Sequence, residues 1–473
     1  MSISVSMRNN VRAKDSSSTR WVVLVLLILG MAGCYVFMYV LSPLQIMLQD
    51  SCGWSPMAYG RYSSASSFLN VFCFFLIFAG IILDKMGVRY TAITASLIML
   101  GGGFINYFAL TQAFVDSTLY DQMERFMNLP DAWWNITPFC SGMPATAKLS
   151  ALGYMIFGVG CEMAGISASR ASVKWFMGKE MSLSMGIQLA CSRFAVAFTF
   201  WISPRLADLG GLANVSRPVG FAVLLLMIGL VCFISYAFID GRERNGKIKE
   251  EPFRMYDLKK LFTGKAFWII AGICIFFYAS VFPFQRYAIA MLQCSLGVDD
   301  RTASDLFTFF PIVAAVLMPP ICYYVDRKGR ATYILLGGAV LIFACHCIFA
   351  FVLPVVKSMV LASFGVGMLG LSVCLVSATL WPSVPRLVSP GILGSTYASL
   401  YWLQNVGLWS VPMLVAYVLQ KSNVGMENPM DYSYTQTMIV FCILSAFTVM
   451  LSIIMILADR KGKWNLNQPI YKN

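Results

Sequence analysis

The sequence contains few charged residues for its length. Only 12% of its 473 residues are Asp, Glu, Lys or Arg, whereas 58% are hydrophobic. Water-soluble globular domains carry about 25% charged residues, so the composition excludes a soluble enzyme or a soluble binding module. Most of the folded surface must face lipid, and we expect the lipid bilayer to surround the chain.

Motifs for metal, nucleotide or covalent chemistry are also missing from the sequence. The 14 cysteines lie mostly in apolar runs without a CxxC pair, and His346 is the single histidine. No P-loop and no nucleophile paired with a base is recognisable. We therefore expect neither an enzyme nor a bound cofactor. A histidine is suited to proton coupling, but the position of His346 in the ninth apolar run favours a structural role.

Apolar runs long enough to cross a membrane are abundant. A spanning helix needs about 20 mostly apolar residues, and short polar breaks separate twelve such runs. The expected fold class is an all-α integral membrane protein with twelve transmembrane helices in two six-helix halves. The spans are expected near residues 20–48, 64–83, 91–115, 148–169, 181–203, 217–239, 266–293, 303–325, 331–353, 356–381, 391–419 and 434–458.

The polar breaks predict the domain organisation. Residues 1–19 are an N-terminal tail, 20–239 a first six-helix bundle, 240–265 a linker, 266–459 a second bundle and 460–473 a C-terminal tail. The linker is the longest break on its side of the membrane and mixes charges of both signs. We expect the single chain to act as a monomeric carrier.

Basic residues in short loops predict the orientation. Lys85 and Arg89 follow the second run, Lys174 follows the fourth, and Arg327 and Lys328 follow the eighth. Loops rich in Lys and Arg stay on the cytoplasmic side, so both termini are expected to be cytoplasmic. These loops also account for the formal net charge of +13, and we do not expect nucleic-acid binding.

The longest external segment is expected at residues 116–147. Cys52 and Cys140 both fall in external loops, where they are either a disulfide or two free thiols. Asn135 and Asn214 begin glycosylation triplets. An accessory subunit on this segment is left open by the sequence.

A short motif occurs twice, at equivalent places in the two halves. Gly80, Asp84, Lys85, Gly87 and Arg89 follow the second run, and the second copy follows the eighth run at Asp326, Arg327, Gly329 and Arg330. This pattern resembles the signature motif of the major facilitator superfamily, whose transporters consist of two related halves. The resemblance implies a cytoplasmic latch, in which Asp84 accepts hydrogen bonds from the start of the eleventh helix.

Glu162 and Arg193 are charged residues inside the fourth and fifth apolar runs. Ionisable groups at this depth are costly and usually functional. Counting about 1.5 Å per helical residue, the two lie at heights that long side chains can bridge. They are either a clamp for a zwitterion or a structural ion pair between the two helices. The small residues Gly158, Gly160 and Gly165 either make room for a ligand or permit close helix packing.

The runs around these residues resemble one branch of the superfamily, the lysosomal dipeptide uniporters. The similar segments are 158–162, 175–180, 188–193, 281–284, 380–383, 393–397 and 404–408. The resemblance implies dipeptide transport, with Glu162 and Arg193 at the charged ends of the peptide. Cys161, beside Glu162, and the long external segment depart from that branch.

A dipeptide also needs amide and phenol groups around its peptide bond. Candidates on other helices are Tyr35, Tyr39, Gln45, Asn70, Gln188, Tyr278, Gln404 and Asn405. Trp381 precedes Pro382, which allows a helix bend, so Trp381 is either a moving gate or an interfacial side chain.

The function expected is alternating-access transport of small zwitterionic solutes, dipeptides above all, as a uniporter. The alternative is a proton-coupled symporter or antiporter of another small organic solute, such as an organic anion bound by Arg193 alone. Neither tail carries an acidic dileucine-type signal, so the sequence favours a plasma or bacterial inner membrane over a lysosomal one.

Overall fold

The computed structural model describes residues 17–132, 134–176, 181–210, 214–242, 262, 264–387, 393–460 and 464–468. Within these ranges every regular secondary-structure element is a helix, and turns and loops join the helices. The long helices are α1 (Ser17–Tyr39), α3 (Pro56–Phe72), α4 (Phe75–Ala109), α7 (Ala145–Phe176), α8 (Met181–Ala207), α9 (Ser216–Arg242), α11 (Lys265–Leu296), α12 (Asp300–Lys328), α13 (Ala331–Cys347), α15 (Met359–Leu387), α16 (Leu393–Ser422) and α17 (Thr435–Arg460).

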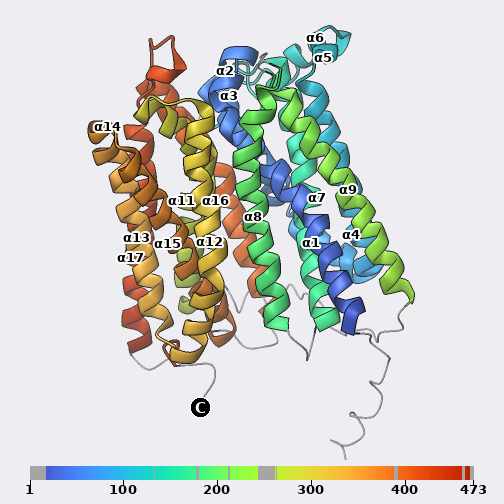
Figure 1. Cartoon of the computed structure of the whole chain (residues 1–473), viewed down its shortest axis with the longest axis vertical. Coiled ribbons are helices and arrows are strands. Elements are labelled where there is room, and N and C mark those ends of the chain that lie inside the picture. Colours follow the sequence, from blue (N-terminus) through green and yellow to red (C-terminus); the bar gives the residue numbers. More distant parts are fainter. Residues whose placement is uncertain are drawn as a thin grey trace, which may run out of the picture.

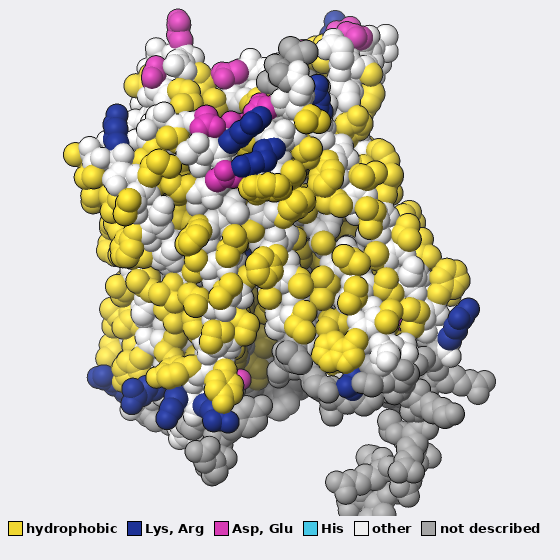
Figure 2. Space-filling model, viewed as in Figure 1, with side chains coloured by type: hydrophobic (Ala, Val, Ile, Leu, Met, Phe, Trp, Pro, Cys, Tyr) yellow, Lys and Arg dark blue, Asp and Glu magenta, His cyan; other side chains and the backbone are white. Residues whose placement is uncertain are grey.

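Eleven helices in the described part of the chain are long and apolar enough to cross a membrane. The all-α membrane fold predicted from the apolar runs is confirmed. Figure 2 shows hydrophobic side chains covering the middle of the visible face, with charged side chains gathered toward its two ends. This distribution fits an apolar band in lipid between two wet rims.

The second predicted span differs from the helix that forms there. The apolar pattern predicts residues 64–83, but α3 begins at Pro56, where the Ser55 hydroxyl accepts a hydrogen bond from the Ala58 backbone nitrogen. Phe74, in the left-handed region at φ 51°, breaks the helix before α4. A second break inside α4 lies at Gly87, whose φ of 78° is accessible to glycine at little cost. Polar residues near the start of α3 lower its hydropathy, so the hydropathy pattern placed the beginning of the span too late.

Two other spans end in short irregular pieces. After α1 the chain forms a 3₁₀ turn (Ser42–Leu44) and α2 (Gln45–Cys52). After α13 it forms a π turn (Ile348–Val352) and α14 (Leu353–Val356). A proline lies in or next to each break, at Pro43 and Pro354, and it removes a backbone donor.

The helices form two halves that lie side by side, α1–α9 and α11–α17 (Figure 1). Within the first half α4 packs on α7 and α1 on α9, and within the second α13 packs on α15 and α17. Glycine permits a close crossing of α4 and α7, because a Cβ on Gly102 would lie 2.5 Å from the Gly153 oxygen. The two halves meet where α3 packs on α16 and α8 on α12, so side chains on these helices face the interior between them.

The chain after α4 contains α5 (Gln112–Val115) and α6 (Thr118–Arg125), which lie above the first half (Figure 1); α6 falls in the segment 116–147 that is expected to be external. Arg61 of α3 holds it: this guanidinium is 3% exposed, pairs with Asp131 at 2.8 Å and donates to the backbone oxygens of Asn135 and Thr137. Cys140 is buried nearby, and both Cys140 and Cys52 are free thiols. Of the two alternatives for Cys52 and Cys140, the structure therefore contains two free thiols and not a disulfide.

Candidate functional site

Glu162 lies midway along α7, half-buried, on the side that faces the second half. The Asn405 amide of α16 donates a hydrogen bond to its Oε1 at 3.4 Å, and Asn405 is itself 2% exposed. The amide also donates to the Tyr401 backbone oxygen at 3.1 Å, which fixes its orientation. The carboxylate of one half thus accepts a hydrogen bond from a neutral donor of the other half. Among the described residues, no cation pairs with this carboxylate.

Arg193 lies on α8 and is also half-buried. Its Nε is buried without a hydrogen-bond partner among the described groups. The guanidinium lies within electrostatic range of Tyr35 and Tyr39 of α1 and of Tyr278 of α11. These neighbours come from both halves, so Arg193 faces the interior between them.

Glu162 and Arg193 do not form an ion pair with each other. Both side chains are described, and neither appears with the other in a salt bridge or hydrogen bond. Of the two alternatives for this pair, the geometry therefore does not support a structural ion pair between the fourth and fifth spanning helices. The two opposite charges face the interior between the halves without pairing with each other.

Tyr278 and Trp381 form a linked pair on the second half. The Trp381 indole donates to the Tyr278 hydroxyl at 2.6 Å, and the Ser377 hydroxyl lies 3.5 Å from the same oxygen. The Trp381 ring stacks on Tyr401, with centroids 5.0 Å apart. Trp381 is half-buried in α15, next to Pro382 inside the helix. Trp381 is therefore held by neighbours within its own half.

The other predicted site residues divide into three groups. Tyr35, Tyr39 and Tyr278 lie within electrostatic range of Arg193, and Asn405 donates to Glu162. Gln188 instead donates to the Ser172 hydroxyl of α7. The remaining three have no described contact with the charged pair, although each leaves one buried side-chain oxygen without a partner: Gln45, Asn70 and Gln404.

Arg286 of α11 is an interior charge that the motif analysis did not single out. It is half-buried, its Nη1 donates to the Met38 backbone oxygen at 3.4 Å, and its guanidinium lies over the rings of Tyr39 at 5.5 Å and Tyr154 at 5.4 Å. All three contacts belong to the first half. A signal was present, because an arginine inside the apolar run 266–293 is as unusual as Arg193.

The glycines around Glu162 serve packing more than ligand space. A Cβ on Gly158 would lie 2.0 Å from the Ser66 oxygen, and one on Gly160 would lie 2.6 Å from the Ala95 oxygen. Only glycine permits these approaches of α7 to α3 and α4. Gly165 alone of the three opens onto free space.

His346 lies in the core of the second half. It is 0% exposed, its Nδ1 lies 2.8 Å from the Ser445 hydroxyl, and its ring packs against Phe284 and Phe441. Its contacts come from α11 and α17 of the same half. This setting agrees with the structural role expected for it.

The first motif copy is described only in part. Gly80 and the side chains of Asp84 and Lys85 are not among those that the structure describes. The predicted latch therefore lies outside the described residues. Arg89 is described: its Nε pairs with Asp240 of α9 at 2.5 Å. Lys174 at 2.6 Å and the Trp175 indole at 2.9 Å bind the same carboxylate, which is 1% exposed. The basic end of the motif is thus fixed within the first half.

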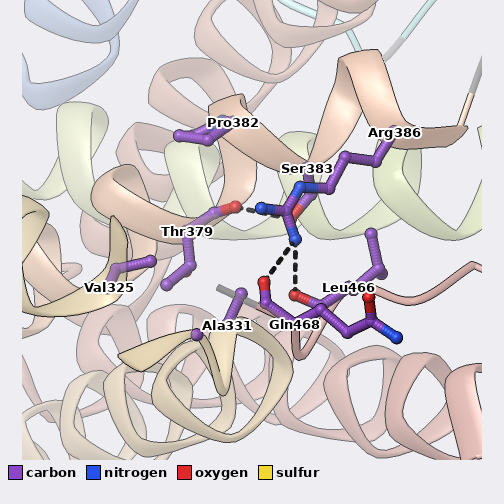
Figure 3. A pocket seen from close by; sticks show the side chains of 9 residues that line it. Val325, Ala331, Thr379, Pro382, Ser383, Arg386, Leu466 and Gln468 are labelled. Atoms are coloured by element: carbon purple, nitrogen blue, oxygen red, sulfur yellow. Dashed lines mark hydrogen bonds between the residues drawn. The ribbon is translucent and has the colours of Figure 1, made fainter. Parts of the chain in front are cut away.

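The second copy is built differently. Gly329 and Arg330 both adopt positive φ, at 68° and 60°, and turn the chain between α12 and α13. Asp326 is within electrostatic range of Arg386 of α15, and Arg327 lies over the Tyr323 ring. Figure 3 shows the Arg386 guanidinium reaching the backbone oxygens of Leu466 and Gln468, at 3.1 and 2.9 Å.

Residues 464–468 therefore pack onto the end of the second half where α12 and α13 join. Leu466 is 0% exposed, and its nitrogen donates to the Asp459 carboxylate at 3.0 Å. The Arg330 nitrogen donates to the Asn467 oxygen at 3.0 Å. The two copies of the motif thus have different partners, a buried aspartate in the first half and the tail in the second.

Comparison with known families and proteins gives consistent results. The family model of the Major Facilitator Superfamily matches residues 26–408. The lysosomal dipeptide transporter MFSD1 of Homo sapiens is 24% identical over 332 residues, covering 67% of this chain and 67% of that protein. MFSD1 of Bos taurus is 27% identical over 285 residues, covering 57% of this chain and 59% of the relative. The chain thus spans roughly three fifths to two thirds of the length of these relatives.

Solved structures show the same fold at lower identity. The nucleoside transporter NupG is 13% identical, with a TM-score of 0.66, and covers 93% of this chain and 98% of its own. A bacterial homolog of the human lysosomal transporter Spinster, inward-facing and occupied, is 14% identical, with a TM-score of 0.64, covering 95% and 99%. At these identities the likeness concerns the fold alone.

Proposed function

Because the chain belongs to the Major Facilitator Superfamily and is a multi-pass membrane carrier, we propose that its substrates are small zwitterions, dipeptides above all. The observation that supports this is the pair Glu162 and Arg193. They are opposite charges from one half, face the interior between the halves, and lack an ion partner among the described residues. The names of the relatives, lysosomal dipeptide transporters, agree with this substrate class.

In the proposed complex each end of a dipeptide finds a complementary group. Glu162 binds the α-ammonium, and Arg193 binds the α-carboxylate through the two-pronged geometry of a guanidinium. Asn405 orients Glu162 from the second half, and the phenols of Tyr35, Tyr39 and Tyr278 offer hydroxyls to the peptide bond. Substrate bound to these groups touches both halves, as alternating access about a central site requires.

We propose that transport is uniport. A zwitterion supplies both charges that the site needs, so no proton is required to balance it. His346, the single histidine, is buried in the second half away from Glu162 and Arg193. The second candidate is proton-coupled transport of an organic anion, for which Arg193 alone would bind the substrate and Glu162 would carry the proton.

We propose that the halves at 20–239 and 266–459 rock as units joined by the linker 240–265, with both termini cytoplasmic, and that the carrier works as a monomer. For its membrane, the lack of an acidic dileucine-type signal supports a plasma or bacterial inner membrane. The name of the relatives supports a lysosomal one. Fluorescence microscopy of the tagged full chain against membrane markers separates these locations.

Counterflow in proteoliposomes tests the function. Wild type, Glu162→Gln and Arg193→Ala are compared on dipeptides, free amino acids and sugars at two pH values. We expect wild type to exchange dipeptides with little dependence on a pH gradient, and both variants to lose that exchange. Retention of activity by Glu162→Gln with an organic anion as substrate would favour the second candidate. Exchange of sugars alone would contradict both.

A further inference from the structure

The interior between the halves carries more positive than negative charge. Three side chains with a formal charge, among the described residues, face it: Glu162, Arg193 and Arg286. The other charged groups buried near the helix ends have carboxylate or amide partners, as in Arg61 with Asp131 and Lys148 with Asn128. One carboxylate against two guanidinium groups leaves an excess of one positive charge.

Arg286 is held by neutral groups only. The Met38 oxygen and the faces of Tyr39 and Tyr154 surround its guanidinium, and no ion pair among the described residues includes it. Aromatic faces and a carbonyl stabilise a cation, but each by far less than a carboxylate does in a site shielded from water. A half-buried guanidinium of this kind attracts an anion from solution.

The two guanidinium groups lie on helices that meet at α1. Arg286 lies over the Tyr39 ring of α1, 5.5 Å from its centroid, and the same ring packs at 5.9 Å against Phe200 of α8, the helix that carries Arg193. Cys161, the neighbour of Glu162 on α7, lies 3.1 Å from Cys34 of α1. The helices that carry Glu162 and Arg193 thus both pack on α1, and Arg286 reaches α1 from the opposite half.

We propose that Arg286 is a second carboxylate anchor, and that the preferred substrates are dipeptides with one acidic side chain. This inference rests on the proposed dipeptide transport. The α-ammonium binds Glu162, the α-carboxylate binds Arg193, and the side-chain carboxylate of an Asp or Glu residue binds Arg286. With such a substrate the charges of site and ligand sum to zero. A neutral side chain leaves one positive charge uncompensated, and a lysine side chain adds a second.

Counterflow with matched peptides tests this preference. Ala-Glu and Ala-Gln have the same shape and differ by one negative charge, and Ala-Lys reverses the sign. We expect the half-saturating concentration of Ala-Glu for wild type to be at least about tenfold lower than that of Ala-Gln. A factor of this size is what one charge-assisted hydrogen bond in a site shielded from water contributes. Ala-Lys is expected to be the weakest of the three.

Substitutions at Arg286 locate the cause. Arg286→Gln is expected to bring Ala-Glu and Ala-Gln to the same half-saturating concentration while Ala-Gln is still exchanged. Arg286→Lys keeps the charge and is expected to keep most of the preference. Arg460→Gln, which removes an exposed arginine at the end of α17, is the matched control and is expected to behave as wild type.

Three results would overturn the inference, and they differ from one another. If wild type exchanges Ala-Glu and Ala-Gln equally, dipeptide transport stands and the acidic preference fails. If Arg286→Gln weakens all peptides by the same factor while Arg286→Lys restores them, Arg286 serves the closure of the helices and not selection. If replacing chloride by gluconate abolishes exchange of Ala-Gln, the anion that Arg286 binds is an inorganic ion and not the side-chain carboxylate of the substrate. Exchange of no dipeptide at all would contradict the proposed function itself.

Discussion

The two halves are joined by ion pairs at the end that is expected to be external, a contact called the external contact below. Charged groups are paired in this contact, whereas among the described residues those in the interior between the halves form no ion pair. At the external end Arg205 of α8 binds Asp305 of α12 at 2.7 Å, and Arg301 binds Asp208 at 3.2 Å. Figure 2 shows charges of both signs gathered over the upper ends of these helices. In the interior Glu162 and Arg193 belong to the same half and do not pair.

This difference shows how charge can be divided between structure and ligand binding. The external pairs are half-exposed, and exposed pairs contribute only about 0 to 1 kcal/mol. Such contacts hold the two halves together at this end and still separate readily, as the proposed alternating access needs. The interior charges are shielded from water, so a partner there contributes much more. The interior charges are the ones that we propose bind the transported solute.

The largest expected effect follows from neutralising the interior carboxylate. Glu162→Gln keeps the shape of the side chain but loses the charge that binds an ammonium. A hydrogen bond to a charged group contributes about 1.5 to 3 kcal/mol, so we expect dipeptide exchange to fall by about ten- to a hundredfold. Counterflow in proteoliposomes measures it. Glu427→Gln, on the exposed external loop, is the control, and an equal loss in that variant would contradict the assignment.

Changing the guanidinium on α8 is expected to have a somewhat smaller effect. Arg193→Lys keeps the positive charge but loses the two-pronged geometry that matches a carboxylate. We expect the half-saturating concentration of a dipeptide to rise by about tenfold, within the range for lost charge-assisted bonds. A peptide amide, which lacks the terminal carboxylate, should be insensitive to the change. An equal loss with the amide would mean that Arg193 supports the fold and does not bind substrate.

A neutral hydrogen bond in the same interior should matter less. Trp381→Phe removes the indole donor to the Tyr278 hydroxyl and keeps an aromatic ring against Tyr401. One neutral hydrogen bond contributes about 0.5 to 1.5 kcal/mol, so a two- to tenfold loss of exchange rate is expected. Trp134→Phe, at an exposed loop position, is the matched control. A complete loss in Trp381→Phe would instead favour its role as a moving gate.

Much of the fold could be predicted from the sequence because the bilayer imposes a simple rule. A span needs about 20 apolar residues, and most spans obey it. The second did not, because polar residues such as Arg61 and Asn70 face protein in α3 and lower the apparent hydropathy. The breaks at Phe74 and Gly87 depend on backbone conformation, which hydropathy does not report.

The site was predictable where a charge lay alone in an apolar run. Glu162 and Arg193 stood out for this reason, and Arg286 carried the same signal without a familiar motif beside it. The sequence did not decide whether Glu162 and Arg193 form an ion pair with each other. The rotation of each helix about its axis decides this, and the neighbouring residues in the sequence do not report that rotation. The roles of Gly158 and Gly160 likewise depended on which backbone lies opposite, a tertiary fact.

The smallest effect is expected at the external contact. Asp305→Asn removes the charge of the pair but keeps a group that the Arg205 guanidinium can still reach, and Arg205 retains its place over the Trp201 ring, 4.8 Å from the centroid. The loss should stay within about 1 kcal/mol, so exchange should change by less than about fivefold. Raising the salt concentration should affect wild type more than the variant, because salt screens exposed pairs. A loss as large as that of Glu162→Gln would mean that the external charges, too, contribute to substrate binding, and the contrast between the two regions would disappear.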